Sequence, residues 1–169
     1  MWPLNEHNLC WIFCRPRVGR SLVLPRFTPP GWYECDVCEV TDAGYLREYE
    51  IKLSRRDFWA DSYKGMAPGR LSKHEKLRMR ADVGPSQFWF IIPVGLVPVD
   101  QVPDFAGVYT VQWNSTSPWK STFLEKRPAP RLHSHKVDAR MRQRMIGTAY
   151  WRFHSQMHRN AMENGNKTR

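Results

Sequence analysis

The segment from Glu34 to Leu53, ECDVCEVTDAGYLREYEIKL, has the pattern of a tight β-hairpin. Apolar and polar residues alternate on both sides of Asp42-Ala43-Gly44, which is typical of two antiparallel strands joined by a short turn. Glycine readily takes the positive φ that the last residue of a three-residue hairpin loop needs. A turn centred on Ala43 sets the register of every residue pair in the hairpin, so this segment constrains the fold closely.

This register brings acidic and basic side chains together. It places Asp36 opposite Glu50, and Glu34 opposite Lys52. Opposed residues, and residues two apart on one strand, point to the same face of a sheet, so Asp36, Glu50 and Lys52 share a face. Two carboxylates with Cβ atoms about 5 Å apart repel each other unless a positive charge lies between them. A divalent cation would supply that charge; the alternative is a solvated cross-strand charge cluster on an exposed hairpin face.

The positive charge of the chain is concentrated in its C-terminal part. The 169 residues carry a formal net charge of +10. Residues 1–119 contain 14 Lys and Arg against 13 Asp and Glu, whereas residues 120–169 contain 12 against 3. A near-neutral body with a basic C-terminal third favours a polyanionic partner, most simply nucleic acid, over a tail that only improves solubility.

The N-terminal residues lack the features of an export signal. The stretch MWPLNEHNLCWIFCRPR has no basic region followed by an unbroken apolar run, and no later stretch approaches membrane-spanning length. We therefore expect no membrane association and a cytoplasmic location, which is the host cytoplasm if a phage encodes the chain.

Four cysteines lie near the N-terminus, with the spacings CxxxC and CxxC. A zinc knuckle needs a turn between its paired cysteines, but the two residues between Cys35 and Cys38 have the pattern of a strand. We therefore predict that Cys10, Cys14, Cys35 and Cys38 are small, reduced, buried residues rather than metal ligands.

Periodicity divides the rest of the chain into helices and strands of one α/β domain. The predicted helices cover residues 4–14, 54–64, 71–81 and 136–162, and the further strands cover residues 20–26, 87–92 and 107–112. Residues 1–112 would form the core, 113–135 an extended connector and 163–169 a disordered tail. Apolar side chains at every fourth position from Met141 to Met157 predict that the basic C-terminal helix packs on the core.

The order of these elements resembles that of the PD-(D/E)XK nuclease superfamily: a helix with an early Glu, a strand, a strand with Asp, a turn, a strand with Glu-Ile-Lys, and a helix. More narrowly, GWYECDVCEVTDAGYLREYEIKLSRRDFWAD is similar to small phage and bacterial proteins related to the MmcB-like DNA repair nucleases. In these, the Glu-x-Lys strand runs into a Ser-Arg-x-Asp-Phe-x-x-Asp segment, here Ser54 to Asp61. The resemblance covers about residues 4–112. The chain departs from the superfamily name in having Cys35, not Pro, before the Asp, and GMAPGRLS looks like an insertion.

The resemblance implies a restriction-endonuclease-like core, an α/β fold with a central mixed sheet of four or five strands flanked by helices. It implies a Mg²⁺ ion, replaceable by Mn²⁺, held by Asp36 and Glu50 with the Ile51 carbonyl and Glu6. The catalytic residues would be Asp36, Glu50 and Lys52, with Lys52 orienting the attacking water or stabilising the phosphorane. Contacts to nucleic acid are assigned to basic residues of the helices and their flanks: Arg55, Arg56, Lys64, Lys73, Arg140 and Arg144.

These features predict a Mg²⁺-dependent DNA endonuclease that hydrolyses phosphodiester bonds in phage or bacterial DNA processing or repair. The alternative is a binding module, in which a nuclease fold holds nucleic acid or blocks a host defence protein with little or no cleavage. The presence of Asp36, Glu50 and Lys52 favours the enzyme, because a site without activity has no chemical reason to keep like charges close. The sequence leaves open the choice between DNA and RNA, and whether two chains pair as a homodimer to cut both strands.

Overall fold

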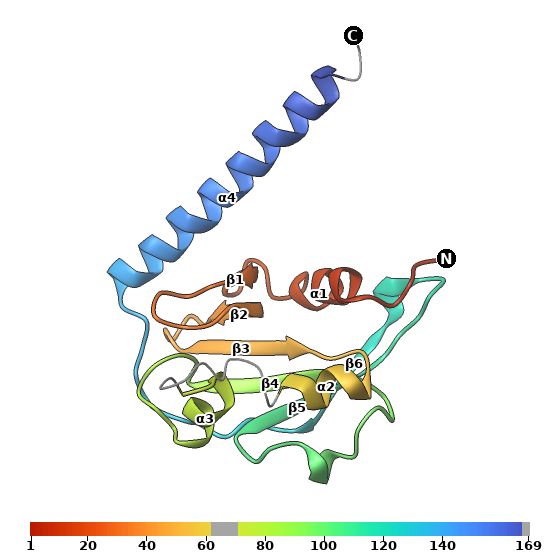
Figure 1. The fold of residues 1–169 in the computed structure, drawn as a ribbon, viewed down its shortest axis with the longest axis vertical. Coiled ribbons are helices and arrows are strands. Elements are labelled where there is room, and N and C mark those ends of the chain that lie inside the picture. The colour runs from red at the N-terminus through yellow and green to blue at the C-terminus, as the bar shows by residue number, and fades with distance from the viewer. Residues whose placement is uncertain (62–70, 167–169) are drawn as a thin grey trace. The chain divides into compact units, whose positions relative to one another are not determined.

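A computed structural model describes residues 1–61 and 71–166 of the chain (Figure 1). Its compact sheet unit comprises Met1–Lys136 and is followed by a second unit, Val137–Arg169. The elements, in chain order, are α1 (Glu6–Cys14), β1 (Leu22–Phe27), β2 (Cys35–Val40), β3 (Leu46–Ile51), α2 (Arg55–Asp61), α3 (Lys73–Arg78), β4 (Gln87–Pro93), β5 (Ala106–Gln112), β6 (Thr122–Arg127) and α4 (Ala139–Asn166). Two short 3₁₀ turns, Val99–Gln101 and Pro118–Lys120, precede and follow β5.

The predicted hairpin is confirmed in its register. Val37 on β2 pairs with Tyr49 on β3, and Cys38 pairs with Glu48, as a turn centred on Ala43 requires. Gly44 closes the turn with a φ of +87°. Its N–H donates to the Thr41 carbonyl at 2.8 Å.

The sheet is mixed and has six strands, in the spatial order β1-β2-β3-β4-β5-β6 (Figure 1). β1, β2 and β3 form an antiparallel meander, and β4 and β5 each run parallel to the preceding strand in the sheet. The connection from β3 to β4 includes α2 and α3, as a parallel crossover requires. The predicted α/β class is confirmed.

The prediction of an extended connector over residues 113–135 was wrong where β6 forms. This strand pairs antiparallel with β5 and makes the sheet one strand wider than the largest sheet we predicted. Most of the six residues of β6 are exposed, because the strand lies at an edge of the sheet. An edge strand with Glu, Lys and Arg on its surface lacks the apolar alternation from which a strand is predicted.

Each face of the sheet unit has its own apolar core. On one face, Leu9 and Phe13 of α1 pack with Val37, Tyr49 and Ile91. On the other face, the ring of Phe58 in α2 lies 4.9 Å from that of Phe90, and His74 in α3 contacts the Phe88, Phe90 and Phe105 rings. Residues pointing to opposite faces alternate along a strand, so α1 covers one face and α2 and α3 cover the other. The four cysteines are free and buried, which confirms their predicted burial.

The second unit contains the C-terminal helix, α4. Asp138 precedes it, and its Oδ1 accepts from the Met141 N–H at 2.6 Å. The helix runs to Asn166, so the prediction of disorder from residue 163 was wrong for residues 163–166, while residues 167–169 lie outside the described part. Phe153 and Met157 are 66% and 55% exposed, so the apolar stripe is not buried in its second half, and packing of this helix on the core stays a prediction. Among the described helices, none is long and apolar enough to cross a membrane.

Candidate active site

The three residues predicted to form the site lie together on the sheet face that α2 and α3 cover. Asp36 comes from β2, Glu50 from β3, and Lys52 directly follows β3. The Lys52 Nζ donates to Glu50 Oε1 at 2.8 Å, and the Ile51 N–H donates to Asp36 Oδ2 at 2.7 Å. Glu50 and Lys52 are buried, at 7% and 3% exposure, so the alternative of a solvated charge cluster on an exposed hairpin face was wrong.

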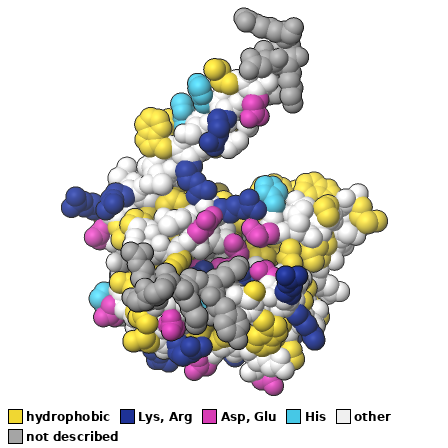
Figure 2. Space-filling model, in the orientation of Figure 1, with side chains coloured by type: hydrophobic (Ala, Val, Ile, Leu, Met, Phe, Trp, Pro, Cys, Tyr) yellow, Lys and Arg dark blue, Asp and Glu magenta, His cyan; other side chains and the backbone are white. Residues whose placement is uncertain are grey.

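A second lysine completes the cluster. Lys73, the first residue of α3, donates from Nζ to Glu50 Oε2 at 2.8 Å and forms an ion pair with Glu48. Glu48 is fully buried, and its Oε2 accepts from Trp32 Nε1 at 2.7 Å. Figure 2 shows Asp and Glu side chains gathered near the middle of one face, with Lys and Arg side chains beside them.

Local sequence fixes where Lys73 lies. Ser72 caps α3: its Oγ accepts from the Glu75 N–H at 3.2 Å, and the Glu75 carboxylate accepts from the Ser72 N–H at 2.6 Å. This reciprocal capping box starts the helix at Lys73. The first turn of the helix then directs the lysine toward the two carboxylates of β3.

Burial and like charges perturb the acidic groups of the site. Burial, the negative charge of Glu50 and, more weakly, that of Glu6 raise the pKa of Asp36 to about 7, against the hydrogen bond from Ile51. Burial also raises the pKa of Glu48. Burial alone would lower the pKa of Lys73, but the carboxylates of Glu48 and Glu50 outweigh it and raise that pKa well above its usual value. Among the described residues, Lys52 and Lys73 form ion pairs with Glu48 and Glu50, whereas Asp36 forms none and is the acid that most lacks a compensating charge.

The other predicted metal ligand, Glu6, lies near the site but is engaged elsewhere. It is in the first turn of α1, and its Oε1 forms an ion pair with Arg26 Nη2 at 3.2 Å. Its charge nevertheless contributes to the raised pKa of Asp36. Glu6 is therefore close enough to act on Asp36 electrostatically, and its role as a ligand stays a prediction.

The residues assigned to nucleic acid belong to different elements of the chain. Lys73 was expected to meet phosphates, but its side chain is only 13% exposed, and binding phosphate would require it to leave its carboxylate partners. Arg55 and Arg56 are exposed on α2, and Arg55 Nε donates to the Leu96 carbonyl at 2.7 Å. Arg140 and Arg144 are exposed on α4, and Lys64 lies outside the described residues.

A magnesium ion at this cluster would have to keep most of its waters. Among residues 1–61 and 71–166, no group of three or more His, Cys, Asp and Glu could hold a metal ion. Mg²⁺ is commonly bound through one or two carboxylates, with waters and substrate phosphate oxygens completing the shell. Asp36 and Glu50 supply two such carboxylates on neighbouring strands. Both oxygens of Glu50 accept from lysines, so an ion bound there would take the place of an ammonium group.

Sequence reasoning missed the pairing of Glu48 with Lys73 and Trp32. A signal existed for Glu48, because it lies two residues from Glu50 on one strand and therefore on the same face. No comparable signal existed for Lys73 or Trp32. Both residues are far from Glu48 in the sequence, and only the folded chain brings them next to it.

Comparisons with known proteins bear on the fold alone. No family model and no curated protein matches the chain. Among solved structures, it is similar to the SPO1766 protein of Silicibacter pomeroyi, a protein of unknown function, with a TM-score of 0.59 over 98% of this chain and 96% of that one. The two sequences are 17% identical, so the likeness shows a shared fold and carries no information on chemistry.

The affinity for Mn²⁺ should rise with pH up to about 7 and then level off. Asp36 must lose its proton to bind a cation, and burial together with the charges of Glu50 and Glu6 raises its pKa to about 7. Below that pH, the affinity should fall about tenfold per pH unit, because one proton leaves for each ion bound. Titrations followed by electron paramagnetic resonance of free Mn²⁺ measure this. A parent protein whose affinity is constant from about pH 5 to about pH 9 would contradict it.

Proposed function

We propose that this protein is a metal-dependent DNA endonuclease built on a restriction-endonuclease-like core. The observation that carries the proposal is that Asp36 on β2 lies near two buried residues, Glu50 on the adjacent antiparallel strand β3 and Lys52 directly after it. An acid on one strand and a Glu-x-Lys on the next is the arrangement implied by the resemblance to PD-(D/E)XK nucleases. The meander β1-β2-β3, followed by a helical crossover to the parallel strand β4, is compatible with such a core.

The roles follow from the charges. Asp36 and Glu50, with the Ile51 carbonyl, would hold Mg²⁺ or, in its place, Mn²⁺. When bound, the ion would lower the pKa of a water and neutralise charge on the phosphate. The contact with Glu50 would hold the Lys52 ammonium group beside the bound water and the phosphate. There Lys52 would orient the water or stabilise the charge that builds up on the phosphate oxygens.

The second candidate is a binding module without cleavage. One observation favours it: the ammonium groups of Lys52 and Lys73 already satisfy both oxygens of Glu50. A cluster neutralised by its own lysines can be stable without a metal ion. In this alternative the fold would hold nucleic acid or a protein partner, and Asp36 and Glu50 would be structural.

Incubation with DNA separates the two candidates. The purified chain is mixed with supercoiled plasmid, linear duplex and single-stranded DNA, in Mg²⁺, in Mn²⁺ and in EDTA. The endonuclease proposal expects nicked or linear plasmid in either metal and intact plasmid in EDTA. Binding of DNA without a cut in any metal would transfer the assignment to the binding module.

The basic helix α4 should contribute to DNA affinity in a salt-dependent way. Arg140 and Arg144 are both exposed and lie four residues apart, so they share one face of the helix. Reversing both charges (Arg140→Glu with Arg144→Glu) should reduce the slope of log affinity against log salt by about two, since each lost phosphate contact accounts for about 0.9. A double reversal of the exposed Lys120 and Lys126 makes the same charge change outside the helix and serves as the control. Equal slopes for the helix variant and the parent protein would exclude this helix from the DNA-binding surface.

A further inference from the structure

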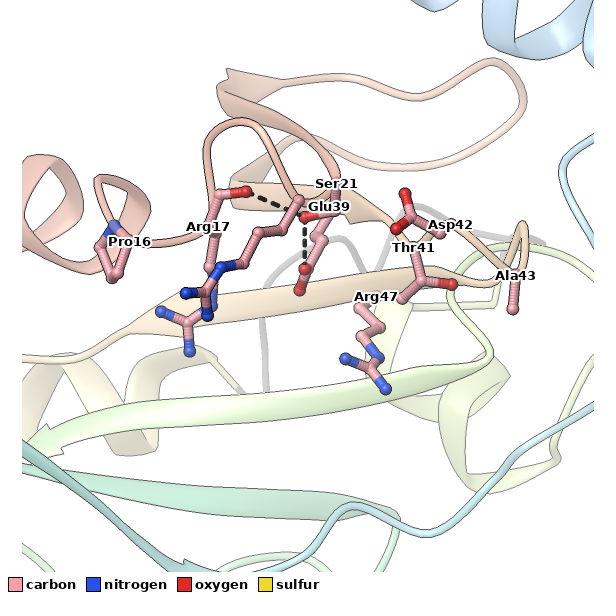
Figure 3. Close-up of a pocket in the computed structure, with 9 residues that line it drawn as sticks. Pro16, Arg17, Ser21, Glu39, Thr41, Asp42, Ala43 and Arg47 are labelled. Atoms are coloured by element: carbon pink, nitrogen blue, oxygen red, sulfur yellow. Dashed lines mark hydrogen bonds between the residues drawn. The ribbon is translucent and has the colours of Figure 1, made fainter.

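A pocket lies on the opposite face of the sheet from Asp36 and Glu50. It has a volume of about 570 Å³ and is open to solvent. The turn after α1, the end of β2 and the start of β3 line it, with the side chains of Arg17, Arg20, Ser21, Glu39, Thr41 and Arg47 (Figure 3). Glu39 and Arg47 are cross-strand partners, and Arg47 lies two residues before Tyr49 on β3. Their side chains therefore point to the same face of the sheet as Tyr49, which is the face that α1 covers.

Two of the three arginines are held in place by aromatic rings and by single hydrogen bonds. The Arg17 guanidinium lies 3.5 Å from the centre of the Phe13 ring, and its Nη1 donates to the Phe13 carbonyl at 2.7 Å. Arg47 lies over the Trp89 ring at 5.6 Å, and its Nε donates to Gln87 Oε1 at 3.2 Å. A guanidinium has five N–H donors, so each of these groups keeps donors for a ligand. Arg20 is exposed at the same pocket.

The one buried acid of the pocket does not neutralise these arginines. Glu39 is 6% exposed, and both of its oxygens accept from neutral donors, Ser21 Oγ at 2.7 Å and Tyr49 Oη at 2.6 Å. Figure 3 shows Ser21 between the Arg17 backbone and Glu39, joined to both by hydrogen bonds. Within the described part of the chain, no arginine forms an ion pair with Glu39. Asp42, an exposed acid that also lines the pocket, forms no ion pair with these arginines among the described residues. Three arginines against two acids leave the pocket with an excess of positive charge.

We propose that this pocket binds a phosphate group through Arg17, Arg20 and Arg47. Planar guanidinium groups match phosphate oxygens in pairs, and stacked arginines are pre-ordered for such contacts. A volume of about 570 Å³ is enough for a mononucleotide and falls in the range of small-molecule sites. The phosphate can come from a free mononucleotide or from the 5′ end of a nucleic-acid strand. The proposal does not depend on metal binding or cleavage at Asp36 and Glu50.

Calorimetry on the full chain tests this pocket with defined probes. The probes are adenosine 5′-monophosphate, adenosine, and a short oligothymidylate with and without a 5′-phosphate, all in EDTA so that the other site is silent. The monophosphate should bind and adenosine should not. If the 5′-phosphate raises the affinity of the oligonucleotide more than it raises the affinity of adenosine, the pocket is assigned to strand ends. If it raises the affinity of the oligonucleotide by the same factor or less, the pocket is assigned to free nucleotides.

Two variants locate the binding. Arg20→Gln removes an exposed charge, and Arg20→Gln with Arg47→Gln removes two of the three; Arg17 is left intact because it packs on Phe13. The double variant should lose at least about tenfold in affinity for the monophosphate, and the single variant less, since charge-assisted hydrogen bonds are lost. Arg15→Gln, an exposed arginine that lies over Trp119 outside the pocket, should bind like the parent protein. The proposal fails if adenosine binds as tightly as its monophosphate, or if the single and double variants both keep the parent affinity.

Discussion

Replacement of Asp36 by Asn, or of Glu50 by Gln, is expected to abolish DNA cleavage while leaving DNA affinity equal or higher. Each change keeps the shape of the side chain and removes one of the two carboxylates that would hold the ion. Lewis-acid stabilisation of a phosphoryl transition state contributes several kcal/mol. Its loss should lower the cleavage rate by about a thousandfold or more. Affinity should not fall, because a carboxylate beside the scissile phosphate repels it.

The measurement is plasmid nicking in Mg²⁺ alongside binding of the same DNA in EDTA. Glu34→Gln is the matched control, since Glu34 is an exposed acid two residues before Asp36 that contacts the cluster through its backbone carbonyl, which accepts from Lys73 Nζ at 3.5 Å and is unchanged by the substitution. This variant should cut like the parent protein. An Asp36→Asn protein that nicks plasmid at the parent rate would refute the metal site, whatever the DNA affinity of the chain.

The sequence predicted those contacts of the site that join residues close together along the chain. The pairing of Asp36 with the Glu50 strand is a local matter: a period of two, a short turn and a Gly at positive φ specify it. Lys52 follows from the same strand. These elements are close in sequence, so alternation alone predicted that their side chains meet.

The second lysine could not be predicted in the same way. Lys73 reaches Glu48 and Glu50 from a helix more than twenty residues further along the chain, and only the packing of α3 on the sheet brings it there. Sequence reasoning placed a positive charge between the carboxylates and assigned that charge to a metal ion. In the structure two lysines lie against Glu50, and one of them also pairs with Glu48, so an ion bound at Glu50 must displace an ammonium group.

The edge of the sheet and the end of the C-terminal helix escaped prediction for a different reason. β6 pairs on one side only and is mostly exposed, so no apolar alternation marks it. The last turn of α4 has the composition of a disordered tail, ENGN, and nothing in that composition predicts that the helix continues. Hydrophobic periodicity reports burial, and segments without burial leave no such pattern.

Removing Lys73 should destabilise the protein strongly. The Lys73→Met variant keeps a side chain of similar length but leaves Glu48, which is fully buried, and Glu50 without the ammonium group that lies between them. Breaking a buried ion pair by removing one partner costs about 3–5 kcal/mol, because a charge remains buried without compensation. Urea denaturation at neutral pH measures the loss. Lys76→Met, in the same helix, removes an ammonium group 4.9 Å from the centre of the Tyr33 ring and should cost at most about 1 kcal/mol.

The same variant shows whether a cation and Lys73 occupy the same place. If they do, Mn²⁺ should bind Lys73→Met more tightly than the parent protein, because the ion no longer displaces an ammonium group from Glu50. Bound ion stabilises a folded chain by about 2.7 kcal/mol at a hundred times its dissociation constant, so Mn²⁺ should recover much of the lost stability of this variant. Adding Glu48→Gln to Lys73→Met should also recover stability, in this case without metal, since Glu50 keeps its ion pair with Lys52 and Glu48 carries the charge that loses its partner. If Glu48→Gln stabilises the Lys73→Met protein but Mn²⁺ does not, then no cation binds at the place of the Lys73 ammonium group. That result would favour the binding module over the nuclease.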